Sequence, residues 1–242
     1  MVIDSENLES LADTGYLERV HIQRINAEGR QDMDDIVVKE QPLTIVLNDQ
    51  ELVTLLCLPA DMKYLAVGFL SSEGLLNDKS DIKRIAHDEK RGIVWVETTD
   101  KKTLEPEVLY RRLITSGCGR GASFYSATDV QAEMRVDSAT TVAAPKITDL
   151  VMEFQHRSQV YRATGGVHSA ALSDGQRIVA FHEDIGRHNA VDKIFGDCIL
   201  NDVPTANGIV ITSGRISSEI LLKIARRSIP VLISKSAPTN LG

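Results

Sequence analysis

The feature that most constrains the fold is an alternation of short apolar strands and amphipathic helices in the last part of the chain. Residues 177–181, 209–211 and 231–233 have the β-branched, apolar pattern of strands, and residues 217–227 have the pattern of a helix. Between the first two strands, the apolar residues fall on one helical stripe, Ala190, Val191, Ile194, Phe195, Cys198 and Ile199. Because strand–helix–strand units give parallel strands with right-handed crossovers, this order predicts a parallel sheet.

Polar side chains follow each of these strands. They are Glu183, Asp184, Arg187 and His188 after the first strand, Ser213, Gly214 and Arg215 after the second, and Lys235 and Ser236 after the third. The carboxyl ends of strands in an open α/β sheet border the ligand crevice, so we expect these residues to converge. Hydroxyls, Arg, Lys and helix N-terminal amides suit phosphates, whereas carboxylates suit base amino groups or ribose hydroxyls. The sequence therefore predicts a nucleotide-like ligand.

Each cluster alone also has a purely structural explanation. A serine can cap the helix that follows it, an acid and a base can form an ion pair, and a histidine can lie on the surface. Likewise Gly165, Gly166 and His168, where a strand is expected over residues 167–172, allow either a tight turn with a buried histidine or close approach of the backbone to a ligand. Three clusters at successive strand ends favour the ligand.

The first half is predicted to be mainly β-structure around one helix. Strand patterns lie at residues 36–39, 43–47, 52–58 and 93–98, with a hairpin turn at 48–50. A helix is expected from a cap at Asp61 to a stop at Gly74, and another is expected to begin at Thr148. The predicted organisation is an irregular polar arm over residues 1–35, a β-rich lobe over 36–112, a long loop over 113–147 and an α/β lobe over 148–242.

One of the three cysteines stands in a setting suited to chemistry. Cys118 is flanked by glycines and lies close to Arg111, Arg112 and Arg120, whose charges favour thiolate over thiol. An open, nucleophilic sulfur on a loop is what accepting and delivering a persulfide requires, although an unreactive loop thiol is the alternative. Cys57 and Cys198 lie in apolar patterns and are expected in the core.

Composition excludes several classes of protein. The net charge of −7 argues against nonspecific binding to nucleic acid or an anionic membrane. We find no signal-peptide pattern and no run of ~18 apolar residues, so a cytoplasmic protein without membrane spans is expected. Sparse cysteines offer neither a disulfide framework nor paired zinc spacing. The His-x-Glu and Pro-Cys-x-x-Cys motifs of zinc deaminases are also missing, so we expect no metal.

Taken together, these motifs resemble the formate dehydrogenase accessory (FdhD) family of sulfur carriers. The resemblance runs from about Lys39 to Thr239. The matching stretches are residues 40–43, 66–74, the Cys118 loop, 164–171, 183–193, 213–215 and 234–239. Their order and spacing make the match specific.

The resemblance implies a cytidine-deaminase-like α/β fold without zinc, beside a smaller N-terminal β lobe, in a homodimer. It implies a sulfurtransferase-type activity: a cysteine desulfurase supplies sulfur, and Cys118 carries it as a persulfide to the molybdenum bis-molybdopterin guanine dinucleotide cofactor of formate dehydrogenase. That cofactor, or a GDP-like mimic, is expected at the strand-end clusters. Many family members have Cys-x-x-Cys in the loop, and here Gly121 holds the second cysteine position. Family chains also continue past the stretch that matches residues 234–239, with a strand and a basic segment.

Two other functions stay open at this point. A non-catalytic chaperone would bind the guanine dinucleotide and dock on the dehydrogenase, with Cys118 incidental, and the missing second cysteine keeps this reading open. A zinc or nucleotide hydrolase is disfavoured because its ligands are missing. Gain of sulfur on Cys118 distinguishes the carrier from the chaperone.

Overall fold

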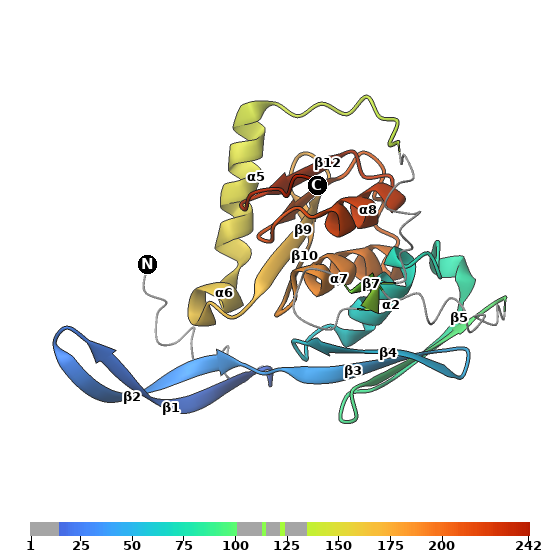
Figure 1. The fold of residues 1–242 in the computed structure, drawn as a ribbon. Helices are drawn as coiled ribbons and strands as arrows, with labels where there is room; N and C mark the ends of the chain where they lie inside the picture. The colour runs from blue at the N-terminus through green and yellow to red at the C-terminus, as the bar shows by residue number, and fades with distance from the viewer. Residues whose placement is uncertain (1–14, 101–112, 115–121, 124–134) are drawn as a thin grey trace.

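The computed structural model describes residues 15–100, 113–114, 122–123 and 135–242, which form a mixed α/β fold (Figure 1). The helices are α2 (Met62–Ser72), the 3-10 helix η1 (Lys79–Asp81), α5 (Ala144–Arg157), α6 (Gln159–Thr164), α7 (Arg187–Leu200) and α8 (Ser218–Arg226). The strands are β1 (Leu17–Asn26), β2 (Gly29–Val38), β3 (Gln41–Leu47), β4 (Gln50–Cys57), β5 (Ile82–Asp88), β6 (Ile93–Thr98), β7 (Leu113–Ile114), β8 (Ala122–Ser123), β9 (His168–Ser173), β10 (Ile178–Asp184), β11 (Ile209–Thr212) and β12 (Val231–Ser234). Within the described ranges, no helix is long and apolar enough to span a bilayer.

An antiparallel hairpin opens the described chain. Strands β1 and β2 pair along their whole length, and their turn end extends away from the rest of the molecule (Figure 1). Exposed polar pairs such as His21–Asp34 and Gln23–Asp32 link the two strands. The expectation of an irregular arm is therefore wrong from Leu17 onward. The apolar alternation in this ribbon is short, with Val20 and Ile22 in β1 opposite Asp35 and Met33 in β2, and polar residues surround it, so the strands were not recognised from the sequence.

The next sheet has the strand order β4-β3-β6-β5 and largely follows the sequence expectation. Strands β3 and β4 form the predicted hairpin, with Asn48 and Asp49 at φ 48° and 67°. Strand β6 lies parallel to β3 and antiparallel to β5. The buried side of this sheet, with Leu43, Ile45 and Val94, packs against α2. Gly74 follows that helix at φ 76°, which confirms the predicted stop.

The second sheet has the order β10-β9-β11-β12, so β9 separates β10 from β11, two of the three strands that were predicted to form a parallel sheet. Strand β9 is antiparallel to both β10 and β11, whereas β11 and β12 are parallel. The sheet is mixed rather than parallel because β9 forms a hairpin with β10 and also pairs with β11. Strands β10, β11 and β12 still run in one direction. Their carboxyl ends therefore meet the start of β9, where His168 lies opposite Asp184 and Ala170 opposite Thr212.

Helices connect the two sheets. Helix α7 covers one face of the second sheet and α5, which begins at Ala144 rather than Thr148, covers the other. Helices α2 and α7 cross in close contact, since a Cβ on Gly68 would overlap the Asp192 carbonyl and a Cβ on Gly196 would overlap the Tyr64 carbonyl. The layers therefore run from the first sheet through α2 and α7 to the second sheet and α5. The predicted division into an arm, two lobes and a loop stays a prediction.

Candidate functional site

The strand-end edge of the second sheet brings most of the predicted clusters together. His168 Nδ1 lies 3.2 Å from Ser213 Oγ, which also accepts the Ser169 N–H at 3.0 Å. Ser234, at the end of β12, donates its hydroxyl to the Gly214 carbonyl at 2.7 Å. The start of β9 and the ends of β11 and β12 are thus joined by side-chain hydrogen bonds. This edge presents hydroxyls and imidazole where a ligand crevice is expected.

Arg187 brings the start of α7 into the same edge. Its side chain packs on Gly214, because a Cβ there would lie 2.7 Å from Arg187 Cβ. The residue is only 9% exposed, and among the described residues its Nε has no hydrogen-bond partner. A buried guanidinium N–H that lacks an acceptor is energetically costly unless another group supplies one. This arrangement suits an anionic ligand at the edge.

The two histidines at this edge are neutral near pH 7. Burial, reinforced by the positive charge of Arg187, lowers the pKa of His168 below its ordinary value. Burial, with Lys223 and Arg187 nearby, lowers the pKa of His188 to about 3. His188 Nε2 lies 3.3 Å from a carboxylate oxygen of Glu219 but outside hydrogen-bond geometry. Both rings therefore act as neutral donors or acceptors, and Arg187 supplies positive charge.

Glu183 is engaged inside the protein. Its carboxylate accepts the backbone N–H groups of Val160 at 3.1 Å and Tyr161 at 3.2 Å, at the start of α6. It also accepts the Ser169 hydroxyl at 3.2 Å. Burial raises the pKa of Glu183, although these hydrogen bonds act in the opposite direction. In this arrangement Glu183 anchors α6 behind the edge instead of pointing to a ligand.

Asp184 is also fully occupied by the protein. Its side chain is wholly buried and lies 2.7 Å from Lys193 Nζ. It further accepts hydrogen bonds from the N–H of Leu58 at 3.2 Å, the N–H of Gly186 at 3.0 Å and the amide of Asn189 at 2.8 Å. Asp184 thereby fixes the turn from β10 into α7 and ties it to the end of β4. Its role in this geometry is to position Arg187 and His188.

The remaining predicted contact residues lie on the surface. Gly165, Gly166, Arg215 and Lys235 are exposed, and Ser236 is half-buried. Gly165 ends α6 at φ 66°, a conformation that favours glycine. The side chains of Arg215 and Lys235 border the edge at the ends of β11 and β12, where they can contact a phosphate.

The predicted nucleophile, Cys118, lies outside the described residues. The other two cysteines are buried, and burial raises the pKa of Cys57 and of Cys198 to about 12. A thiol with such a pKa carries almost no thiolate near neutral pH. Both residues therefore have the core role that their apolar sequence context predicted.

A buried histidine between two carboxylates was not foreseen. His182 Nδ1 lies 3.0 Å from Asp61 and Nε2 lies 2.9 Å from Asp197, so β10 is linked to the start of α2 and to α7. Burial lowers the pKa of His182, but the two carboxylates more than offset this and hold the pKa above its ordinary value. Asp61 was expected to cap α2, yet it makes no side-chain cap and binds this histidine instead.

A second buried charge pair lies between the helices. Lys223 of α8 donates to Asp192 of α7 at 2.6 Å, and Ser72 of α2 donates to the same carboxylate. The sequence carried no signal for it, because Asp192 and Lys193 fall between the members of the apolar stripe, where charged residues of an amphipathic helix usually face solvent. Charges are rarely buried unless they are paired. The partners of Asp192 come from α2 and α8, which are distant in the sequence.

Comparison with known proteins identifies the family. The profile of the FdhD/NarQ family matches residues 38–242. The Sulfur carrier protein FdhD of Bacillus pumilus is 42% identical over 208 residues, which cover 86% of this chain and 79% of the relative. The protein of the same description from Bacillus subtilis is 41% identical over 87% of this chain and 80% of the relative.

A solved structure shows the same fold. It is a crystal structure from Desulfotalea psychrophila, described as that of a formate dehydrogenase accessory protein. Its TM-score to this chain is 0.76 at 27% identity, and the alignment covers 93% of this chain and 86% of the other. The family profile, the curated relatives and this structure all agree with the family resemblance that the sequence motifs carry. The chain belongs to the FdhD/NarQ family.

Proposed function

We propose that this chain is a sulfur carrier for the molybdenum bis-molybdopterin guanine dinucleotide cofactor of a formate dehydrogenase. The Cys118 thiolate attacks the terminal sulfur of a cysteine desulfurase persulfide, which gives Cys118–S–SH and returns the desulfurase thiolate. The carrier then gives that outer sulfur to the reduced cofactor, its bound substrate. The sulfur–sulfur bond breaks, Cys118 leaves as the thiolate, the proton goes to solvent, and the cofactor supplies the two electrons that bring the sulfur to the level of sulfide. Membership of a family whose relatives are described as sulfur carriers is the observation that carries this proposal.

The strand-end edge is the proposed holder of the guanine dinucleotide. Arg187, Arg215 and Lys235 supply positive charge for its phosphates, and charge-assisted hydrogen bonds make such contacts strong. The hydroxyls of Ser213 and Ser236 and the neutral rings of His168 and His188 supply further donors and acceptors. Gly165 and Gly166 lie exposed just before β9, where a ligand can approach the backbone, and Gly214 makes room for the Arg187 side chain.

Glu183 and Asp184 enter this proposal in a changed role. The sequence suggested that they accept hydrogen bonds from the ligand, but both carboxylates are occupied by protein donors. We therefore assign them to positioning of α6 and of the start of α7. Arg187 is the side chain that depends most directly on Asp184, since it follows the turn that Asp184 fixes.

The same proposal includes a cytoplasmic homodimer with cytidine-deaminase-like layering. A cytoplasmic location keeps the Cys118 thiol reduced and accessible to a desulfurase. The layering is supported by two features: a sheet covered by helices on both faces, and polar strand ends at one edge.

A chaperone that binds the cofactor without carrying sulfur is the second candidate. Gly121 favours it, because the loop lacks the second thiol found in many relatives. One cysteine is nevertheless sufficient to hold a persulfide.

Intact mass spectrometry distinguishes the two candidates. The chain is incubated with a cysteine desulfurase and cysteine, and we expect the mass to rise by one sulfur atom. Cys118→Ala should abolish the gain, whereas Cys198→Ala, which removes a buried thiol, should retain it. A gain that persists in Cys118→Ala, or no gain in the unmodified chain, would favour the chaperone.

A further inference from the structure

A hydroxyl–imidazole pair, Ser213 and His168, lies at the strand-end edge, and its surroundings fix the direction of its hydrogen bond. Ser213 follows β11 directly and is tied to Ser169 of β9 by two hydrogen bonds. Its N–H donates to the Ser169 carbonyl at 3.0 Å, and its Oγ accepts the Ser169 N–H at 3.0 Å. The serine side chain is therefore held in one orientation, with Oγ 3.2 Å from His168 Nδ1.

A count of donors and acceptors gives the direction of this hydrogen bond. A hydroxyl has one proton to donate, and a neutral imidazole carries a proton on only one of its nitrogens. Among the described residues, the hydrogen-bond partners of Ser213 Oγ are the Ser169 N–H and His168 Nδ1. Since the Ser169 N–H can only donate, the hydroxyl proton has an acceptor in the protein only when Nδ1 is unprotonated. The proton of the neutral ring then lies on Nε2.

The Nε2 atom of His168 is available to a ligand. It has no hydrogen-bond partner among the described residues, and the ring is half-buried. Burial and the charge of Arg187 lower the pKa of His168, so the ring is neutral near pH 7 and lies close to that guanidinium. Asp184, whose charge acts in the opposite direction, is paired with Lys193. A proton on Nε2 therefore adds a second N–H without an acceptor to the Nε of Arg187.

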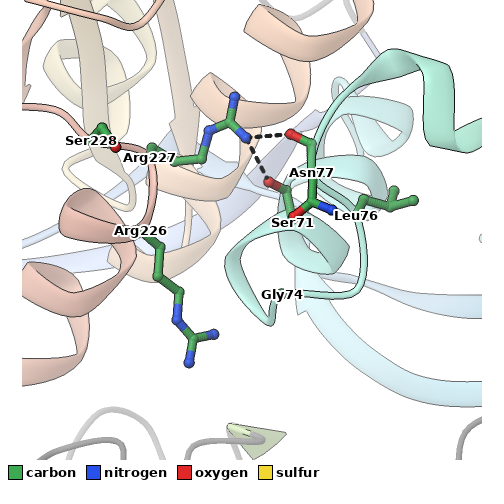
Figure 2. A pocket seen from close by; sticks show the side chains of 7 residues that line it. All are labelled: Ser71, Gly74, Leu76, Asn77, Arg226, Arg227 and Ser228. Carbon is green, nitrogen blue, oxygen red and sulfur yellow. Dashed lines mark hydrogen bonds between the residues drawn. The ribbon is translucent and has the colours of Figure 1, made fainter. Parts of the chain in front are cut away.

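In the described part of the chain, Arg187 and Arg227 both have a buried Nε without a hydrogen-bond partner, but their surroundings differ. Arg227 lines a cavity of about 380 Å³ between the ends of α2 and α8, where its Nη1 donates to the Asn77 carbonyl at 2.7 Å (Figure 2). Burial lowers the pKa of Arg227, and the nearby charge of Asp78 opposes this. Arg187 lies near Glu219 but forms no hydrogen bond or ion pair with a described residue. Unused donors are thus concentrated at the strand-end edge.

We propose that Ser213 is a positioning residue. By donating its hydroxyl to Nδ1 it fixes the ring and keeps the proton on Nε2, so that His168 donates this N–H to a phosphate oxygen of the guanine nucleotide. This role depends on the nucleotide site of the proposed function. A ring protonated on Nδ1 would instead present the lone pair of Nε2, which repels a phosphate oxygen. A ring that is already fixed also loses little entropy when the ligand binds.

Nitrogen NMR of the imidazole rings, on the ligand-free chain at mildly alkaline pH, tests the direction of the hydrogen bond. We expect the His168 proton on Nε2 and an Nδ1 signal typical of a nitrogen that accepts a hydrogen bond. His156 provides an internal reference for the opposite tautomer, because its Nδ1 lies 2.8 Å from the Met152 carbonyl, which can only accept. A His168 proton on Nδ1 would overturn the proposal.

Three variants show whether Ser213 is responsible. Ser213→Thr, which keeps a hydroxyl, should preserve the His168 signals. Ser213→Ala should shift the Nδ1 signal to that of a nitrogen without a hydrogen bond, while its own N–H still binds the Ser169 carbonyl and holds the turn. Ser234→Ala removes a hydroxyl from the same edge that does not bind His168, so it should leave the signals unchanged. Unchanged signals in Ser213→Ala would also overturn the proposal.

Calorimetry with GDP tests the consequence for binding. Ser213→Ala should bind about two- to tenfold less tightly, the cost of ordering a released side chain, and Ser213→Thr should bind like the unmodified chain. In a chain that already carries His168→Ala, Ser213→Ala should have no further effect, because the serine acts through the ring. Additive effects, or equal affinity of Ser213→Ala and the unmodified chain, would refute this role alone. No GDP binding by any of these chains would refute the nucleotide site and this role with it.

Discussion

The two four-stranded sheets differ in how they are covered, and this difference locates the site. Strand β3 of the first sheet alternates between buried and half-buried residues, because only its α2-facing side is tightly packed. Every residue of β11 in the second sheet is buried, since α7 covers one face and α5 the other. A sheet buried on both faces leaves its strand ends as the accessible place for polar groups. The first sheet therefore supports the candidate site, and the second sheet presents it.

The support acts through a few buried contacts. Leu58, directly after β4, donates its N–H to Asp184, and Asp61 binds His182 of β10. Together with the crossing of α2 and α7, these contacts fix the turn that carries Arg187 and His188.

Gly196→Val should have the largest effect, because its side chain would overlap the Tyr64 carbonyl where the two helices cross. A backbone group cannot move aside cheaply, so we expect the free energy of unfolding to fall by about 3 kcal/mol or more. Urea unfolding measures the loss. Lys63→Ala, on the exposed side of α2, should unfold like the unmodified chain. Equal midpoints for Gly196→Val and the unmodified chain would show that the crossing does not hold the sheets together.

Arg215→Ala should have the next largest effect, and it acts on binding rather than on folding. Loss of a charge-assisted phosphate contact should weaken GDP binding by about 1.5–3 kcal/mol, as measured by calorimetry. Arg177→Ala serves as the control, because this exposed arginine precedes β10 at the opposite end of the strand. Equal weakening by both substitutions would mean that Arg215 acts only through the overall charge of the protein. No binding of GDP at all would refute the site.

His182→Gln should have the smallest effect, and that effect should depend on pH. The folded-state pKa of His182 lies above its ordinary value of 6.5, so its stabilising contribution is present below that pH and is lost as the pH rises through the folded pKa. The hydrogen bond to His182 lowers the pKa of Asp61, so that residue's contribution is lost only in acid, below its ordinary value of 3.8. The stability difference between the unmodified chain and the variant should thus be larger at mildly acidic than at alkaline pH.

Thermal or urea unfolding across this pH range provides the check. His21→Gln, at an exposed histidine that pairs with Asp34 on the hairpin, should show a much weaker dependence. A stability difference for His182→Gln that stays constant or grows from pH 5.5 to 9 would contradict a charged bridge between the two aspartates.

Local pattern predicted much of the fold. The apolar stripe of α7, the Asn48-Asp49 turn and the glycine after α2 are each encoded within a few residues, and the structure confirms them. The position of β9 between β10 and β11 was missed, because strand order depends on pairing between distant segments. The β1–β2 ribbon was missed because its apolar period, Val20 and Ile22, is short and lies among exposed polar residues.

The same limit applies to the site. Which residues gather at the strand ends was predictable from their position after each strand. What Glu183 and Asp184 bind was not, because their donors come from Val160, Tyr161 and Leu58, the last of these 126 positions away in the sequence. A carboxylate beside a strand end looks the same in sequence whether a ligand or a distant backbone N–H occupies it.

Transfer of labelled sulfur to the cofactor tests the central claim most directly. The chain is loaded by a desulfurase with cysteine that carries a heavy sulfur isotope and is freed of excess reagent. It is then mixed with the reduced molybdenum bis-molybdopterin guanine dinucleotide cofactor, which supplies the two electrons of the transfer. Mass spectrometry should find the label on the cofactor and lost from Cys118, with no transfer by Cys118→Ala. Label that reaches the cofactor equally with Cys118→Ala, or that stays on Cys118 in the presence of the cofactor, would contradict the account.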